Sequence, residues 1–213
     1  MKIAIVGAES TGKTSLAHDL TQAMQADGKS ASWVPELLRE WCDAHGRTPL
    51  PHEQNAISLE QAKRVNLAGP SDFLISDTSP LVTAVYSELL FNDRSLYPFA
   101  LEHQKIYDLT LLTGLDLPWV ADGIQRDGPR AREQFDAQLR HVLGHNRLNY
   151  TVVYGSGNQR TQNALQAIER ASRSGAQPAT RRTSAWKWAC EKCSDAECEH
   201  RMFTDRLQIG LLN

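Results

Sequence analysis

The chain has 213 residues, of which 41% are hydrophobic, and a formal net charge of −2 at pH 7. This size and composition predict one substantial core rather than two full domains. The near-neutral charge excludes a global attractive field for nucleic acid, so no nucleic-acid partner is expected. No apolar stretch reaches the length of a membrane span, and the apolar start at residues 1–6 is too short for a signal peptide. We therefore expect no membrane partner and a cytoplasmic location.

The first predicted element is a buried strand, Lys2–Val6, and the eight residues after it match the pattern G-x-x-x-x-G-K-[ST]. This is the Walker A pattern of a phosphate-binding loop, or P-loop, whose backbone N–H groups face one concavity. Lys13 reaches the outer phosphates and Thr14 offers its hydroxyl to Mg²⁺. The helix predicted over 13–26 adds its positive N-terminal end. We therefore expect ATP and Mg²⁺ as cofactors, with these binding residues: Gly7, Glu9, Ser10, Thr11, Gly12, Lys13, Thr14 and Ser15.

Short apolar runs alternate with helical segments along the rest of the chain. This alternation predicts an α/β fold with a five-stranded parallel sheet covered by helices on both faces. Ligands of such a sheet gather at the carboxyl ends of its strands. Residues 155–158, which follow the fifth strand, can lie there against an adenine ring. The remaining strands are predicted at 31–34, 73–75, 109–112 and 150–154, and the remaining helices at 52–67, 81–91, 129–143 and 159–171.

The second strand, 31–34, leads to a carboxylate at this ligand edge. Glu36 can accept the proton of a substrate hydroxyl while that hydroxyl attacks the γ-phosphate of ATP. Arg39 can bind the substrate, or it can pair with Glu36 or Glu40 on a solvated face. The alternative for Glu36 is a helix-start residue that complements the helix dipole.

The third strand, 73–75, leads to a second carboxylate, Asp77. An acidic residue at this point serves Mg²⁺ directly or through water, or polarises the substrate hydroxyl. Asp77 and Glu36 are therefore rival candidates for the catalytic base, and the sequence does not rank them. The alternative for Asp77 is the N-cap of the helix after Pro80.

Three arginines, Arg126, Arg130 and Arg132, follow the fourth strand within seven residues. Phosphoryl transfer needs positive charge on the migrating group, and an arginine-bearing lid supplies it, so we predict a catalytic role for all three. The alternative places Arg130 and Arg132 on an exposed helix, where they pair with Glu133 and Asp136.

The composition changes after residue 171. Residues 172–184 are rich in Ser, Gly, Ala, Pro, Thr and Arg and carry no apolar period, which predicts a linker. The predicted organisation is therefore a P-loop kinase domain at 1–171, the linker at 172–184, and a C-terminal tail at 185–213.

The predicted tail holds Cys190, Cys193, Cys198 and His200 within eleven residues. Three thiolates and an imidazole fit a closed, structural Zn²⁺ site. A redox dithiol or plain buried thiols are the alternatives. We expect zinc to pin this short tail onto the P-loop domain or onto a protein partner, with a homo-oligomer as one form of that partner.

Residues 7–15, 34–40, 77–78 and 117–123, in this order, resemble the ribosylnicotinamide kinase domain of bifunctional NAD-biosynthesis regulators and, more broadly, nucleoside-kinase-type P-loop proteins. The resemblance covers about residues 1–171 and implies the strand order 2-3-1-4-5. It also implies NAD salvage, in which ATP phosphorylates nicotinamide riboside to give nicotinamide mononucleotide and ADP. Glu36 or Asp77 would then handle the 5′-hydroxyl, and the lid arginines the phosphates. The predicted substrate-binding residues are Glu36, Arg39, Asp77, Trp119 and Asp122.

Two alternatives to this function stay open. Pro35 and Leu37 stand where the family has aromatic residues beside the acidic one, which favours another small nucleoside as acceptor. Trp41, Tyr86 and Trp119 are the remaining candidates for stacking on a cationic ring. The alternative from a different class is a regulatory P-loop ATPase or switch that acts through the zinc-binding tail, and it predicts ATP turnover without an acceptor.

Overall fold

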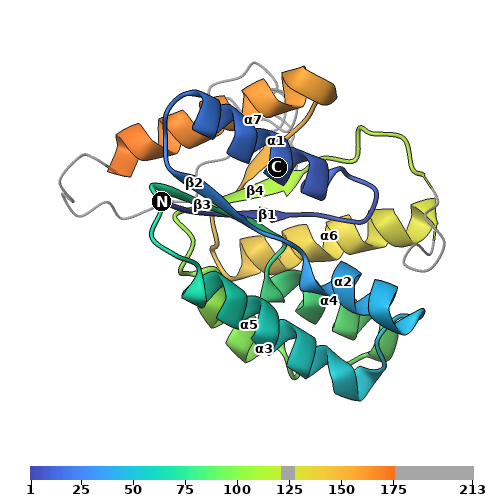
Figure 1. Ribbon diagram of the computed structural model, residues 1–213. Coiled ribbons are helices and arrows are strands. Elements are labelled where there is room, and N and C mark those ends of the chain that lie inside the picture. The colour runs from blue at the N-terminus through green and yellow to red at the C-terminus, as the bar shows by residue number, and fades with distance from the viewer. Residues whose placement is uncertain (121–127, 176–213) are drawn as a thin grey trace, which may run out of the picture.

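A five-stranded parallel sheet forms the middle layer of the protein, with helices on both sides (Figure 1). The computed structural model describes residues 1–120 and 128–175. The strands lie in the order β2-β3-β1-β4-β5, so the predicted fold class and strand order are confirmed. Their bounds are β1 (Lys2–Val6), β2 (Ala31–Val34), β3 (Phe73–Asp77), β4 (Leu109–Thr113) and β5 (Thr151–Val153).

The helices form two layers (Figure 1). α1 (Lys13–Ala26) and α7 (Gly157–Gly175) cover one face of the sheet, above it in the figure. The remaining helices lie on the other side: α2 (Leu37–His45), α3 (Pro51–Leu67), α4 (Pro80–Phe91), α5 (Tyr97–Gln104) and α6 (Pro129–His145).

The apolar sequence of β1 explains why both layers form. Ile3 and Ile5 pack in the core under α1 and α7, whereas Ala4 and Val6 pack in the core on the side of α4 and α6. Successive side chains of a strand point to opposite faces of the sheet. A strand with apolar residues at four successive positions therefore needs a helical layer on each side, and the side chains of residues 3–6 are all fully buried.

Two short helices, α2 and α5, are not among the elements predicted from the sequence. α2 has nine residues and ends at His45, and Gly46 caps it with a φ of 65°, the left-handed conformation that closes many helices. Of its residues only Cys42 is buried. α5 has eight residues and carries Pro98 in its first turn. Neither helix is long enough to show a sustained apolar period, which is the signal that locates helices in a sequence.

The last described helix, α7, continues to Gly175 and so enters the segment predicted as a linker. An ion pair of 2.6 Å between Arg173 and Glu169, four residues apart, supports this additional turn. The rest of that segment and the predicted tail with its four zinc ligands lie outside the described residues, as do Asp122 and Arg126. Of the helices in the described part of the chain, none combines the length and the apolar composition that a membrane-spanning segment needs.

Candidate functional site

The P-loop connects β1 to α1 at the carboxyl edge of the sheet. Gly7 has a φ of 150°, and a Cβ atom at this position would lie 2.1 Å from the Thr113 hydroxyl oxygen. Gly12 has a φ of 73°, in the left-handed region. Both positions therefore require glycine, one because β4 approaches closely and the other because the backbone turns into the helix.

Thr113, the last residue of β4, forms a hydrogen bond with the P-loop. The Thr11 hydroxyl donates to the Ala8 carbonyl at 2.6 Å and shares a hydrogen bond of 2.7 Å with the Thr113 hydroxyl. Lys13 is 9% exposed, and its ammonium group donates to the same Ala8 carbonyl at 3.0 Å. The loop is thus folded around its own lysine. Thr113 is a supporting residue that the sequence analysis missed.

A cavity of ≈ 290 Å³ opens from the P-loop toward α2, α3 and α4. Glu36 and Arg39 line it, as the sequence predicts for substrate-binding residues. Of the three aromatic candidates only Tyr86 is among the lining residues, and its ring packs against Phe135 at 4.2 Å between centroids. The lining residues are Glu9, Ser10, Thr11, Gly12, Lys13, Thr14, Ser15, Glu36, Leu38, Arg39, Cys42, Thr48, Pro49, Gln54, Tyr86 and Leu90.

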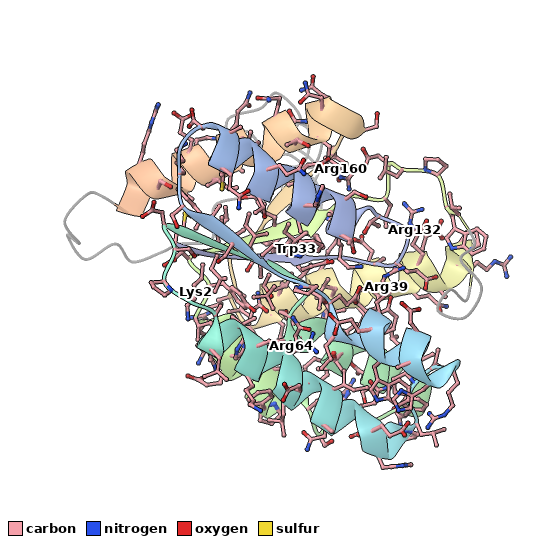
Figure 2. All side chains as sticks on the ribbon, in the orientation of Figure 1. Lys2, Trp33, Arg39, Arg64, Arg132 and Arg160 are labelled. Atoms are coloured by element: carbon pink, nitrogen blue, oxygen red, sulfur yellow. The ribbon has the colours of Figure 1, made fainter. Side chains whose placement is uncertain are left out.

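Glu36 is the N-cap residue of α2, as its alternative predicts, but its side chain makes no capping hydrogen bond. The carboxylate lines the cavity instead. Arg39 follows in the first turn of α2, on the opposite side of the sheet from Arg160 (Figure 2). Glu40, one of its two expected partners, pairs with Arg64 of α3 at 2.7 Å. The start of α2 therefore carries Glu36 and Arg39, two of the five residues predicted to bind the substrate.

Asp77 is the last residue of β3 and is fully buried. Neither carboxylate oxygen has a partner within full hydrogen-bond geometry among the described residues, although the Thr14 hydroxyl is near enough to act on the charge of Asp77. Burial raises the pKa of Asp77 to about 6 and the charge of Glu36 adds to this rise, whereas Thr14, Lys13 and Arg39 act in the opposite direction. The alternative that Asp77 caps the following helix is wrong, because Ser79 occupies the N-cap of α4.

The two lid arginines within the described residues have different surroundings. Arg130 is exposed in the first turn of α6, as its alternative predicts. Arg132 is 5% exposed and donates to the Leu117 carbonyl at 2.8 Å, so the exposed-helix alternative is wrong for this residue. Asp136, its expected partner, pairs with Arg140 at 2.7 Å. Arg132 therefore anchors the segment after β4 and does not line the cavity.

That segment passes beside the P-loop. The Val120 N–H donates to the Ser10 hydroxyl at 2.9 Å, and the Leu117 side chain would lie 3.1 Å from a Cβ atom at Gly12. Trp119, predicted to bind substrate, belongs to this segment and is half-buried, but it does not line the cavity. The segment thus contacts the phosphate loop as well as Arg132 of α6.

Thr14 and Asp77 are the residues suited to Mg²⁺. A hydroxyl and a carboxylate are the hard oxygen ligands that this ion prefers. The buried carboxylate of Asp77 lacks a hydrogen-bond donor among the described residues, and a cation would supply the missing partner. Across residues 1–120 and 128–175 no group of three His, Cys, Asp or Glu side chains forms a metal site.

Comparison with solved structures finds the same fold in proteins of low sequence identity. A NadR protein in complex with NR has a TM-score of 0.66 at 19% identity, covering 84% of this chain and 52% of that one. A NadR protein with NAD and AMP-PNP has a TM-score of 0.64 at 19% identity, covering 84% and 50%. A deoxyadenosine kinase from M. mycoides with dCMP has a TM-score of 0.53 at 14% identity, covering 80% and 100%.

These likenesses confirm the fold that the sequence resemblance implies. The chain spans about half the length of the NadR structures that it matches. Comparison with curated proteins finds no match. The family scan matches residues 2–160, from β1 to the first turn of α7 and therefore through the whole sheet and the P-loop. The chain belongs to the AAA domain family.

Proposed function

We propose that this chain is an ATP-dependent kinase that phosphorylates the 5′-hydroxyl of nicotinamide riboside, giving nicotinamide mononucleotide and ADP. One observation carries the proposal: the P-loop and Glu36 line the same cavity. A nucleotide switch needs a group that positions water, whereas a kinase needs an acceptor site with a base next to the γ-phosphate. A cavity that joins a carboxylate to the phosphate loop meets the second requirement.

The cavity suits a small acceptor with one polar and one flat apolar end. Its volume of ≈ 290 Å³ lies just below the range for small-molecule sites, roughly 300–1,000 Å³. Lys13 and Thr14 make the end at the P-loop polar. Leu38, Leu90 and the Tyr86 ring supply apolar surface. A ribose hydroxyl directed to the P-loop would leave the base against this apolar surface.

In the proposed reaction Glu36 accepts the proton of the acceptor hydroxyl. The hydroxyl oxygen forms a bond to the γ-phosphorus while the bond between that phosphorus and the β–γ bridging oxygen breaks, and ADP leaves with the electron pair. Lys13 and the P-loop amides orient the phosphates. Arg39 holds the acceptor, and Arg130, with Arg126 from outside the described residues, supplies positive charge to the migrating group.

Thr14 and Asp77 would hold Mg²⁺ in this arrangement. When bound there, Mg²⁺ would supply positive charge to offset the negative charge of the phosphate oxygens. Asp77 fits this role better than that of the base, because it is fully buried and is not among the residues that line the acceptor cavity. We therefore assign the role of base to Glu36 and that of Mg²⁺ ligand to Asp77, two carboxylates that the sequence alone does not rank.

Nicotinamide riboside is the first candidate acceptor because its ring is cationic and Tyr86 offers an aromatic face in the cavity. The similar NadR structure holds NR, the abbreviation of this riboside. A neutral nucleoside is the second candidate, since the M. mycoides deoxyadenosine kinase structure holds dCMP and this chain has Pro35 and Leu37 beside Glu36.

A substrate panel with ADP release as the readout tests the proposal. Nicotinamide riboside, adenosine, deoxyadenosine and cytidine are each added with ATP and Mg²⁺, to the native chain and to Glu36→Gln. We expect ADP formation to depend on nicotinamide riboside and to fall at least about a hundredfold in the variant. If a neutral nucleoside is the best acceptor, the proposed substrate is wrong but the proposed kinase activity stands. An ADP rate that no acceptor raises would favour the regulatory ATPase instead.

The expected zinc site at Cys190, Cys193, Cys198 and His200 stays a prediction, because these residues lie outside the described part of the chain. Metal analysis of the full chain, purified without chelators, tests it. One zinc per chain is expected, and its absence would remove the proposed attachment of the tail to the P-loop domain or a partner.

A further inference from the structure

Arg160, in the first turn of α7, is a buried cation that the proposed function does not use. Its side chain is on the side of the sheet opposite Arg39 (Figure 2) and is 4% exposed. A buried charge destabilises a protein unless it is paired and hydrogen-bonded. The hydrogen-bond partners of Arg160 therefore indicate its role in the structure.

The guanidinium group joins three loops at the ligand edge of the sheet. One terminal nitrogen donates to the Thr11 carbonyl of the P-loop at 2.9 Å and to the Gly114 carbonyl after β4 at 3.4 Å. The other donates to the Gly155 carbonyl after β5 at 2.7 Å and to the Asp116 carboxylate at 3.1 Å. All four N–H bonds of the two terminal nitrogens are thus used on backbone or carboxylate oxygens, and none faces the acceptor cavity.

Asp116 completes this arrangement. One of its oxygens accepts the Gly155 N–H at 2.5 Å and the other accepts from Arg160. Burial lowers the pKa of Arg160 and Asp116 acts in the opposite direction, and an arginine stays protonated in proteins. The Asp116 carboxylate, with 31% of its side chain exposed, therefore neutralises the buried charge of Arg160 from a partly solvated position.

The contact with Thr11 has a direct consequence for phosphate binding. A trans peptide is planar, so the carbonyl of Thr11 and the N–H of Gly12 point in opposite directions. Arg160 holds that carbonyl in a hydrogen bond, which leaves the Gly12 N–H on the other side of the peptide, available to the cavity that Gly12 lines. Donors that are fixed before binding lose no freedom when the phosphates arrive.

We propose that Arg160 is a positioning residue for the P-loop: it fixes the Thr11–Gly12 peptide in its phosphate-binding orientation and joins the loop to the segments after β4 and β5. It does not touch the nucleotide. This inference rests on the proposed function only in that the P-loop binds a nucleotide, and it is independent of the acceptor.

The test measures ADP binding with Mg²⁺ by calorimetry, which needs no acceptor. Arg160→Gln is expected to weaken ADP binding about tenfold or more, the equivalent of one lost charge-assisted hydrogen bond. Arg160→Lys keeps the charge but cannot span all three loops, so an intermediate loss is expected. Arg173→Gln is the matched control on the same helix, since its side chain is 77% exposed, and it should bind within twofold of the native chain.

A second readout separates positioning from loss of fold. Thermal melting without nucleotide shows whether each variant is folded. If Arg160→Gln is folded, its KM for ATP should rise while its KM for the acceptor stays within twofold of the native value. If Arg160→Gln does not fold, the ADP affinities of Arg160→Lys and Asp116→Asn test the inference instead. A folded Arg160 variant with native ADP affinity overturns the inference. A native chain that binds ADP but shows no acceptor-dependent turnover overturns the proposed kinase and leaves this inference standing.

Discussion

The buried carboxylate of Asp77 lies close enough to Glu36 for their two negative charges to oppose the ionisation of Asp77. Burial is the larger cause, and the two together raise the pKa of Asp77 to about 6. A charged carboxylate without a hydrogen-bond donor destabilises the chain until a cation binds beside it. The end of β3 therefore favours cation binding at the expense of the stability of the free protein.

The first prediction concerns stability without nucleotide or Mg²⁺. The pKa of Asp77 is raised from 3.8 to about 6 on folding, so its protonated form is favoured in the folded state. The contribution of Asp77 to the free energy of unfolding is fully present below pH 3.8 and is lost as pH rises through 6. The loss is at most about 3 kcal/mol. Asp77→Asn removes this loss and should be more stable than the native chain at pH 8.

Urea unfolding at pH 4, 6 and 8 measures this difference. The advantage of Asp77→Asn should shrink toward pH 4, because the native side chain is then mostly protonated. Asp43→Asn, on the exposed surface of α2, is the control and should show no such trend. A difference between Asp77→Asn and the native chain that is equal at all three pH values contradicts the assigned pKa. The same Asn variant should lose Mg²⁺-dependent turnover.

The second prediction concerns Lys13. Lys13→Ala removes the ammonium group that reaches the phosphates, and turnover of ATP should fall by roughly 10²-fold or more. Lys29→Ala is the control, because Lys29 is half-exposed and pairs with Asp27 at 2.7 Å at the far end of α1. Initial rates of ADP formation measure both variants. Native rates in Lys13→Ala would show that the P-loop is not the site of turnover.

Much of this fold follows from local sequence patterns. The predicted bounds of β1, α1 and β2 coincide with those of the structure, and the other predicted strands differ by at most a few residues. An apolar run between polar turns marks a buried strand wherever it packs, and the P-loop pattern fixes its own turn through Gly7 and Gly12. These signals lie within a few residues of the element that they predict.

The parts that sequence reasoning missed depend on contacts between distant segments. Arg160 and Thr11 are 149 residues apart, and nothing near Arg160 in the sequence distinguishes it from an ordinary arginine in a first helical turn. Thr113 likewise gains its role only because β4 lies beside β1. The different surroundings of Glu36 and Asp77 depend in the same way on α2, whose nine residues give too weak a periodic signal.

The third prediction concerns Tyr86. Its ring lines the cavity at the P-loop and packs against Phe135, with an angle of 30° between the ring planes. Tyr86→Leu keeps apolar surface but removes the π-face, which attracts a cation by about 1–2 kcal/mol. KM for nicotinamide riboside should therefore rise about tenfold, whereas KM for ATP and for a neutral nucleoside should rise about twofold or less. Equal losses for cationic and neutral acceptors would contradict a stacking role.

The fourth prediction concerns Gly7 and Thr113. A Cβ atom at Gly7 would lie 2.1 Å from the Thr113 hydroxyl oxygen, at a φ of 150° that side chains rarely adopt. Gly7→Ala should therefore lower the free energy of unfolding by about 2–4 kcal/mol. Gly144→Ala is the matched control, since Gly144 is helical and its Cβ would meet nothing within 4 Å, and this variant should gain about 0.5–1 kcal/mol.

A double-mutant cycle identifies the cause of the loss. Thr113→Ala alone removes the hydroxyl that bonds Thr11 at 2.7 Å and should cost about 1 kcal/mol. In the Gly7→Ala, Thr113→Ala double variant the new methyl group no longer meets that hydroxyl, so the combined loss should be smaller than the sum of the single losses. Additive losses would instead place the whole cost of Gly7→Ala in its backbone conformation. Subtracting the loss in Thr113→Ala from the loss in the double variant then gives the part of the glycine requirement that the Thr113 hydroxyl does not impose.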